Sequence, residues 1–366
     1  MKLCIISFTR NGALLAGRLA DELGKKELET MVYTKCKGME KECSIPSEEA
    51  EGRKESRPFF VRESIGEWTE KQMGKNHGLL FIGACGIAVR AIAPQLVDKL
   101  QDSPVLVMDE QGRFVIPLLC GHVGGANELA RLLSQVSGAC PVITTATDIW
   151  KKFAVDLFAK KNHLYIENKE GIARVSAKVL EGQNLTLAIE PGHMEEALLP
   201  EKIQLVEYPP ENQVDILISA DKEMERGSLL LRPREYVLGM GCRKEKEPEK
   251  IEAFIAETLK KRKIQLWQIS ALASIWQKKE EPGFLQWSEK HRIPFLTFSG
   301  EELMEVTGNL ASSAFVKEKV GADNVCERAA LKACGQNGCL AAGKEARDGM
   351  TIAIAKRDWR VAFDEE

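Results

Sequence analysis

The chain has 366 residues, of which 44% are hydrophobic and 29% are charged. This composition is ordinary for a soluble globular enzyme, and the length allows two or three cores. The formal net charge of −3 argues against a protein that binds nucleic acid through a basic face. There is no apolar run of about 18 residues, and the first residues read as a strand rather than a signal peptide, so we expect a cytoplasmic protein without a membrane segment.

The ten cysteines contain no Cys-x-x-Cys pair, so the spacing typical of a zinc site is absent. Several, such as Cys4 and Cys140, lie in or beside apolar runs, where cysteine behaves as a small hydrophobic residue. Without an export signal, we expect free thiols rather than a disulfide framework, and no metal bound by the protein.

Apolar runs alternate with amphipathic stretches in the first part of the chain, which predicts a mainly parallel sheet covered by helices. Pro117 lies inside one apolar run and indicates a strand end or an edge position. Gly138 is expected to end a helix. The expected strands are 2–8, 79–83, 105–109, 114–119 and 142–145, and the expected helices are 12–23 and 127–136.

The rest of the chain repeats the alternation. Arg232-Pro233-Arg234 is the clearest candidate linker, because a new strand and helix begin at Tyr236. We expect a helix–strand–helix segment over 151–182 and strands at 185–189, 214–219, 295–298 and 351–355. The predicted fold class is α/β, with N-terminal and C-terminal modules and a small α/β middle segment. The predicted domains are 1–148, 149–231 and 235–366.

The loop 120–127, Cys-Gly-His-Val-Gly-Gly-Ala-Asn, is the strongest candidate site. It lies between an expected strand and a helix start, where α/β sheets commonly bind ligands. His122 can carry a proton near neutral pH, and the Gly124 and Gly125 amides could stabilise an oxyanion. Asn127 is a candidate substrate contact. The alternative is a tight turn with a structural histidine.

A second glycine loop contains Gly83 and Gly86 and leads to Arg90, which could bind a carboxylate bidentately. The alternative is that Arg90 pairs with Asp98. Cys85, in the same loop, is more readily explained as a packed thiol than as a nucleophile.

Two more polar groups follow expected strands. Thr144, Thr145 and Thr147 precede Asp148 and could bind polar substrate atoms or, with Asp148, orient a histidine, or they are helix caps. Asp109 and Glu110 could be the acid or base partner of His122, or they form a hairpin turn.

In the C-terminal part, Gly239, Gly241 and Arg243 are expected in a loop that opens a helix and binds a carboxylate. The third glycine of the dinucleotide fingerprint is missing, so binding of NAD is not supported. The charged turn 278–283 is expected to be solvated.

The residues 83–148 resemble the N-terminal region of the cobalt-precorrin-5A hydrolases. The resemblance continues through 153–182 and resumes at VLGMGCRKEKEPEKI from Val237, LASIWQKKEEPGFL from Leu272 and NVCERAALKA from Asn324. It covers nearly the whole chain in the right order. Glu327 and Lys344 match positions of the family's C-terminal pattern.

The resemblance implies an enzyme that opens the δ-lactone of cobalt-precorrin-5A with water and releases acetaldehyde, giving cobalt-precorrin-5B in anaerobic cobalamin biosynthesis. Cobalt then arrives inside the substrate, so no cofactor is expected. The expected partners are a corrinoid precursor with many carboxylates, a second copy of the chain and other enzymes of the pathway. The alternatives are a non-catalytic corrinoid carrier and a nucleotide-dependent enzyme, although no Gly-Lys-Ser/Thr sequence is present.

Overall fold

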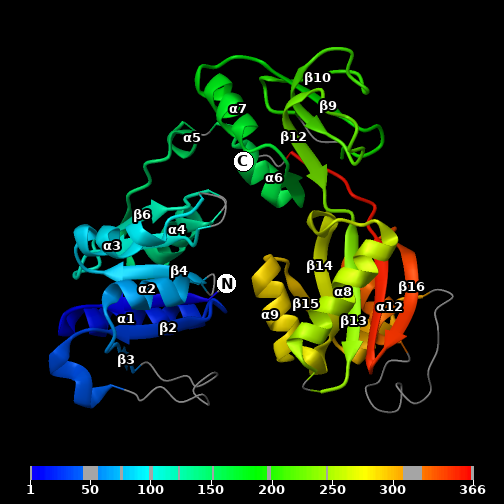
Figure 1. Ribbon diagram of the computed structural model, residues 1–366. Helices are drawn as coiled ribbons and strands as arrows, with labels where there is room; N and C mark the ends of the chain where they lie inside the picture. The colour runs from blue at the N-terminus through cyan, green and yellow to red at the C-terminus, as the bar shows by residue number, and fades with distance from the viewer. Residues whose placement is uncertain are drawn as a thin grey trace. The chain divides into compact units, whose positions relative to one another are not determined.

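The computed structural model describes residues 2–43, 57–74, 77–98, 102–122, 124–150, 152–195, 199–244, 246–307 and 324–363. The chain divides into two compact units, Met1–Lys152 and Phe153–Glu366. The first unit holds one sheet and the second holds two (Figure 1). The mainly parallel α/β class expected from the sequence is confirmed. The three domain boundaries stay a prediction.

The sheet of the first unit has seven strands in the order β3-β2-β1-β4-β5-β6-β7. The first five strands are parallel, β6 is antiparallel to β5, and β7 is parallel to β6. Parallel neighbours need a crossover of about a dozen residues or more, so the short connection 109–113 can only be a hairpin. The elements are β1 (Leu3–Ser7), α1 (Arg10–Gly24), β2 (Thr30–Thr34), η1 (Lys37–Glu42), β3 (Phe59–Phe60), α2 (Ile65–Gly74), β4 (Gly78–Ile82), α3 (Cys85–Ile92), η3 (Ala93–Gln95), β5 (Val105–Met108), β6 (Phe114–Leu119), α4 (Ala126–Ser137), β7 (Cys140–Pro141) and α5 (Ala146–Ile149).

The reversal at β6 gives this sheet two chemically distinct edges. We name the edge at which β1, β4 and β5 end the carboxyl edge, and the edge at which they begin the amino edge. Leu119 pairs with Val105, the first residue of β5, so the chain leaves β6 at the amino edge. With about 3.3 Å per residue, the two ends of β6 are roughly 17 Å apart.

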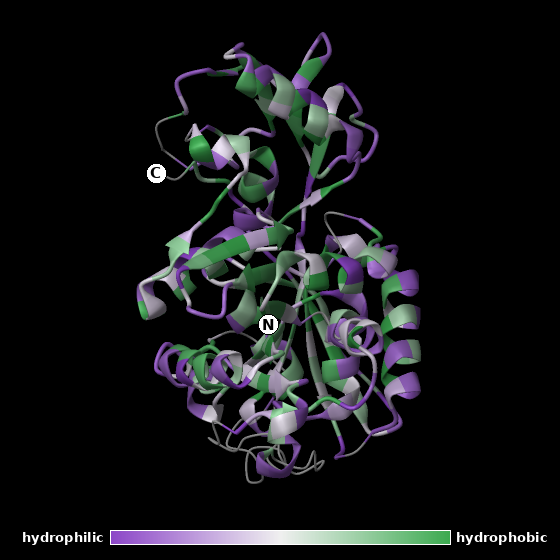
Figure 2. Cartoon of the chain, turned by 90° about the vertical axis from the view of Figure 1, so that its left-hand side faces the viewer, coloured by the Kyte–Doolittle hydropathy of each residue, from purple (hydrophilic) through white to green (hydrophobic). Residues whose placement is uncertain are grey.

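The helices of this unit bury the faces that the sequence predicted. Leu15, Leu19 and Leu23 of α1 are at most 6% exposed, and Gly138 ends α4 in the left-handed region at φ 76°. Figure 2 shows how hydrophobic and hydrophilic bands alternate along the helices. Pro117 lies beyond the part of β6 that pairs with β7, because β7 pairs with Phe114 and Val115; among the described residues this stretch is therefore an edge, as expected.

Two expectations for this unit are wrong. The strand expected at 142–145 is displaced, because β7 covers only Cys140–Pro141 and the next residues run in extended form toward α5. All ten cysteines are free and Cys4 is buried, as expected, but Cys85 and Cys140 are exposed rather than packed. Cys85 begins α3, and the first turn of this helix faces solvent, so its side chain does not pack in the hydrophobic core.

The first sheet of the second unit has five strands in the order β10-β9-β11-β12-β8, all parallel except β8. The expected helix–strand–helix segment and the strands near 185–189 and 214–219 are confirmed. Its elements are α6 (Val155–Lys161), β8 (Leu164–Ile166), α7 (Glu170–Leu180), β9 (Leu185–Ile189), β10 (Ile203–Leu205), β11 (Val214–Ile218) and β12 (Gly227–Pro233).

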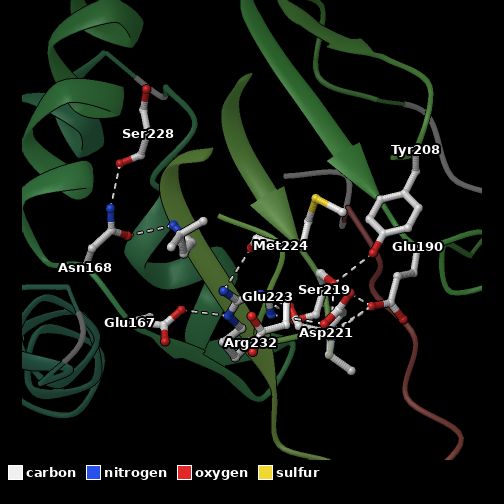
Figure 3. Close-up of polar contacts among 12 residues, drawn as sticks. Glu167, Asn168, Glu190, Tyr208, Ser219, Asp221, Glu223, Met224, Ser228 and Arg232 are labelled. Carbon is white, nitrogen blue, oxygen red and sulfur yellow. Dashed lines mark hydrogen bonds and ion pairs between the residues drawn. The ribbon is translucent and has the colours of Figure 1, made fainter. Parts of the chain in front are cut away.

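Arg232 shows that the expected linker is wrong at its first two residues, which end β12. Its side chain is only 1% exposed. The Arg232 Nε donates to Glu167 at 2.7 Å, and its Nη atoms donate to the carbonyl oxygens of Asp221 at 2.6 Å and Met224 at 3.0 Å (Figure 3). A buried charge needs such partners, and here they hold the loop after β11 in one conformation.

The last sheet has the order β15-β14-β13-β17-β16, with β13, β14 and β15 parallel and β17 antiparallel to both of its neighbours. The strands expected near 295–298 and 351–355 are confirmed. Its elements are β13 (Tyr236–Cys242), α8 (Pro248–Arg262), η4 (Leu266–Gln268), β14 (Ile269–Ile275), η5 (Trp276–Lys278), α9 (Pro282–His291), β15 (Phe295–Phe298), α10 (Gly300–Met304), α12 (Val325–Cys334), β16 (Cys339–Arg347) and β17 (Met350–Lys356).

Gly239 and Gly241 belong to β13, not to a loop, so the expectation of a glycine loop here is wrong. A Cβ on Gly239 would lie 1.8 Å from the carbonyl oxygen of Cys326, because α12 packs directly on the strand. Glycine is therefore needed for the close approach of a helix that lies far away in the sequence.

The charged turn at 278–283 is also not simply solvated. Lys278 and Glu281 form an ion pair at 2.5 Å, and their side chains are 12% and 4% exposed. The second Glu281 oxygen accepts the backbone N–H of Lys246 at 3.1 Å, so this carboxylate ties two loops of the C-terminal sheet together.

Candidate functional site

The amino edge of the first sheet brings His122 next to Asp148. His122 leaves the end of β6, and Asp148 lies in α5, which the chain reaches after α4 and β7. The His122 Nε2 lies 2.6 Å from Asp148 Oδ2 and 3.0 Å from the Thr147 hydroxyl. The side chains of His122 and Asp148 are 17% and 12% exposed, so the pair is sheltered but open to solvent.

Asp148 accepts three further hydrogen bonds. Asn127 Nδ2 donates to Oδ2 at 2.9 Å, the Thr145 hydroxyl donates to Oδ2 at 2.7 Å, and Arg131 Nη2 donates to Oδ1 at 2.6 Å. Burial raises the pKa of Asp148, but the hydrogen bonds from Thr145, Arg131 and His122 outweigh it, so the net shift is downward. The carboxylate is therefore ionised at neutral pH.

This arrangement suits a carboxylate that orients a histidine. A neutral imidazole that donates from Nε2 to an ionised carboxylate has its basic nitrogen at Nδ1. A proton taken up at Nδ1 gives an imidazolium that Asp148 stabilises, as in the histidine–aspartate pairs of hydrolases. The geometry is thus able to perform general acid–base chemistry at His122.

The glycine loop itself is a tightly bonded turn. The N–H groups of Gly125, Ala126 and Asn127 donate to the carbonyl oxygens of His122, Cys120 and Gly121 at 2.9, 3.1 and 3.0 Å. Gly125 has φ +85°, and a Cβ on Gly124 would lie 2.3 Å from the Cys120 Cβ. The first amides of α4 are therefore used within the loop, and the Gly125 amide is not available to an oxyanion in this conformation.

A second group of expected site residues, Gly83, Gly86, Arg90, Asp109 and Glu110, lies at the carboxyl edge. Gly83 and Gly86 follow β4, and the Arg90 Nη1 folds back onto the carbonyl oxygen of Gly86 at 3.0 Å. Asp109 and Glu110 follow β5 in the hairpin that leads to β6. The structure therefore does not bring these residues to His122.

Asp109 serves its own hairpin. Its carboxylate accepts the backbone N–H groups of Gln111, Arg113 and Phe114 at 2.8–2.9 Å. Burial raises the pKa of Asp109, and these bonds, together with the charge of Arg113, lower it further than burial raises it. The hairpin-turn alternative therefore describes Asp109, and Asp148 takes the place beside His122.

Thr144 is exposed and has no contact with the histidine pair, whereas Asn127, Thr145 and Thr147 belong to it. The exposed Arg243 side chain lies against Gly349 in the second unit.

Glu327 has a structural place in the C-terminal sheet. It is 4% exposed and accepts the backbone N–H of Lys344 at 2.7 Å, while Asn324 donates to its second oxygen at 2.5 Å. These bonds tie the start of α12 to β16.

Arg131 is the residue of this site that the sequence analysis missed. It follows Asn127 by four residues, and residues four apart share one face of a helix, so the spacing was a usable signal. Within the described residues, no three His, Cys, Asp or Glu side chains gather to hold a metal ion, and no helix is long and apolar enough to cross a membrane. The absence of a protein-bound metal or cofactor stays a prediction.

Fold and site together define an α/β protein with a histidine–aspartate pair suited to proton transfer. Three family models match successive segments: "Cobalamin synthesis G N-terminal" over residues 67–148, "Cobalamin biosynthesis central region" over 153–233 and "Cobalamin synthesis G C-terminus" over 236–355.

The curated relatives agree with these models. The chain is 35% identical to a cobalt-precorrin-5A hydrolase of Salmonella typhimurium over 69% of this chain and 74% of the relative. It is 33% identical to a cobalt-precorrin-5A hydrolase of Priestia megaterium, over 76% and 78% of the two chains. The chain belongs to the cobalamin synthesis G family.

Solved structures related to cobalamin biosynthesis are also similar. A crystal structure of a cobalamin biosynthesis protein G homolog from Sulfolobus solfataricus is 23% identical, with a TM-score of 0.40 over 97% of both chains. The structure of CobE, a protein from the cobalamin (vitamin B12) biosynthetic pathway, is 30% identical over 33% of this chain and 89% of CobE, with a TM-score of 0.32.

Proposed function

We propose that this chain is a cobalt-precorrin-5A hydrolase. It opens the δ-lactone between the ring A acetate and the methylated C20 carbon with one water molecule, and then releases the two-carbon unit as acetaldehyde, leaving cobalt-precorrin-5B. The observation that carries the proposal is the hydrogen-bonded pair of His122 and Asp148 in a chain of this family. Cobalt enters as part of the substrate.

His122 carries the proton in both stages. Its Nδ1 accepts a proton from the attacking water while Asp148 stabilises the imidazolium that forms. The imidazolium then returns the proton to the C20 oxygen as the lactone C–O bond breaks. For the release of acetaldehyde, His122 takes the proton of the C20 hydroxyl, the bond between C20 and the ring carbon breaks as the aldehyde carbonyl forms, and the ring carbon takes up a proton.

The surroundings of the pair suit a large carboxylated ring. Ile149 and Trp150 follow Asp148 directly and are 59% and 69% exposed, so two large apolar side chains face solvent beside the pair. An apolar surface of this kind can contact the face of a corrinoid ring, and Arg131 adds a cation beside it.

Purified protein incubated with cobalt-precorrin-5A tests the proposal. Acetaldehyde, measured by coupled reduction with alcohol dehydrogenase and NADH, should appear in a one-to-one ratio with the product. Binding of the substrate without release of acetaldehyde would instead support the corrinoid carrier.

A further inference from the structure

Arg131 contacts the histidine pair through Asp148 and is itself half exposed. It projects from α4 on the same face as Asn127, and its Nη2 donates to Asp148 Oδ1 at 2.6 Å. The other oxygen of Asp148 contacts His122, so the guanidinium and the imidazole share one carboxylate, each on its own oxygen. The position of the Arg131 guanidinium therefore affects the position of Asp148 and, through it, of His122.

The guanidinium has donors left over. The Arg131 side chain is 49% exposed, whereas the Asp148 side chain is 12% exposed. Among the residues that the structure describes, Nε and Nη1 of Arg131 contact no acceptor. A guanidinium presents five N–H donors in a rigid planar fork, and that fork matches a carboxylate bidentately.

We propose that Arg131 binds a carboxylate of the substrate with its exposed N–H groups while Nη2 stays on Asp148, so that binding of the anion and orientation of His122 are coupled. Arg131 is then a specificity-determining and positioning residue for polycarboxylate ligands. The identity of the natural ligand rests on the proposed function, whereas the existence of the anion site does not.

The geometry favours Arg131 over Arg90 and Arg113 as the carboxylate-binding residue next to His122. Arg90 belongs to the carboxyl edge and is folded onto Gly86. Arg113 directly precedes β6 and so also lies near the carboxyl edge. Its side chain is 65% exposed, and its Nε lies 3.5 Å from Asp109 Oδ1. Arg113 is thus a matched control: an arginine of similar exposure, paired with an aspartate, at the other end of β6.

Binding of uroporphyrin III, a stable tetrapyrrole octacarboxylate, tests the anion site without turnover. A charge-assisted hydrogen bond contributes about 1.5–3 kcal/mol, so Arg131→Gln should raise the Kd, measured by porphyrin fluorescence, by roughly 10- to 100-fold. Arg131→Lys keeps the charge but not the fork and should lose less. Arg113→Gln should stay within about twofold of wild type. An unchanged Kd for Arg131→Gln, or an equal loss for Arg113→Gln, would overturn the inference.

Coupling to His122 has its own readout. In ¹⁵N-correlated NMR spectra of the histidine rings, addition of uroporphyrin III should shift the His122 signals in the wild type and Arg113→Gln proteins, but not in Arg131→Gln at saturating ligand. Equal shifts in all three would show that Arg131 does not link the ligand to His122. Should acetaldehyde never be released from cobalt-precorrin-5A, the proposed function fails while both of these outcomes remain decisive for Arg131.

Discussion

Asp109 and Asp148 lie at opposite edges of one sheet, and their comparison distinguishes a carboxylate that serves a turn from the carboxylate of the proposed site. Burial raises the pKa of each, and hydrogen bonds lower each by more than burial raises it. Asp109 receives its hydrogen bonds from backbone N–H groups of its own hairpin. The Asp148 carboxylate receives its hydrogen bonds from side chains: His122 in the loop after β6, Asn127 and Arg131 in α4, and Thr145 at the N-cap of its own helix. A low pKa alone therefore does not mark a functional carboxylate, but the kind of donor separates a turn from a site.

The largest expected effect concerns His122. General acid–base catalysis contributes roughly 10²–10⁴-fold, so His122→Ala should lower kcat by about that factor. His122→Gln keeps a hydrogen bond to Asp148 but carries no proton, and should be nearly as slow. The measurement is the rate of acetaldehyde release at saturating substrate, with circular dichroism to confirm folding.

A histidine outside the site provides the control for this experiment. His291 also pairs with a carboxylate, Glu252, at 2.9 Å, but it lies in α9 of the second unit. His291→Gln should therefore keep near wild-type activity. If the His122 variants were as active as His291→Gln, His122 would be a structural histidine.

A smaller effect is expected from the apolar surface at the amino edge. Stacking by an aromatic side chain contributes about 0.5–1.5 kcal/mol, so Trp150→Ala should raise KM by roughly 2- to 10-fold with little change in kcat. Phe114 is the control, because this aromatic side chain is 45% exposed but begins β6 at the carboxyl edge of the sheet, away from His122. A Phe114→Ala variant with the same rise in KM would place the ring-binding surface elsewhere.

The smallest effect is a pH dependence of stability, and its sign follows from the lowered pKa values. Asp109 and Asp148 ionise at a lower pH in the folded chain than the ordinary 3.8 of an unfolded aspartate. Their stabilisation is therefore complete above pH 3.8 and is lost as the pH falls through the folded pKa. The stability gap between wild type and Asp109→Asn or Asp148→Asn, from urea unfolding, should narrow from pH 6 to pH 3. A constant gap would contradict the assignment.

Much of the fold could be predicted from local patterns. The apolar runs of β1, β4 and β5 and the spacing of Leu129 and Leu133 on α4 show periods of strands and helices that depend only on neighbouring residues. The direction of β6 has no such signature, since an apolar run reads alike in both directions. Its only clue is the short connection 109–113, which is too short for a parallel crossover.

The site was harder to predict because it depends on that direction. The sequence allows both Asp109 and the cluster around Asp148 as partners of a histidine. A parallel β6 would place His122 at the same edge as Asp109, whereas the antiparallel strand places it beside Asp148. The prediction for Gly239 was wrong for a related reason. Its local sequence resembles a loop, whereas the contact with Cys326 that requires glycine comes from a helix far away in the sequence. Long-range packing decided both cases.

The most direct test compares the two aspartates in one assay. Asp148→Asn removes the charge that stabilises the His122 imidazolium and should lower kcat/KM for acetaldehyde release by roughly 10²-fold. Asp109→Asn weakens only the hairpin and should change kcat/KM less than about twofold while lowering the melting temperature by a few degrees, as expected for a loss of about 1 kcal/mol. A reversed order, with Asp109→Asn the slower enzyme, would place the chemistry at the carboxyl edge and contradict this account.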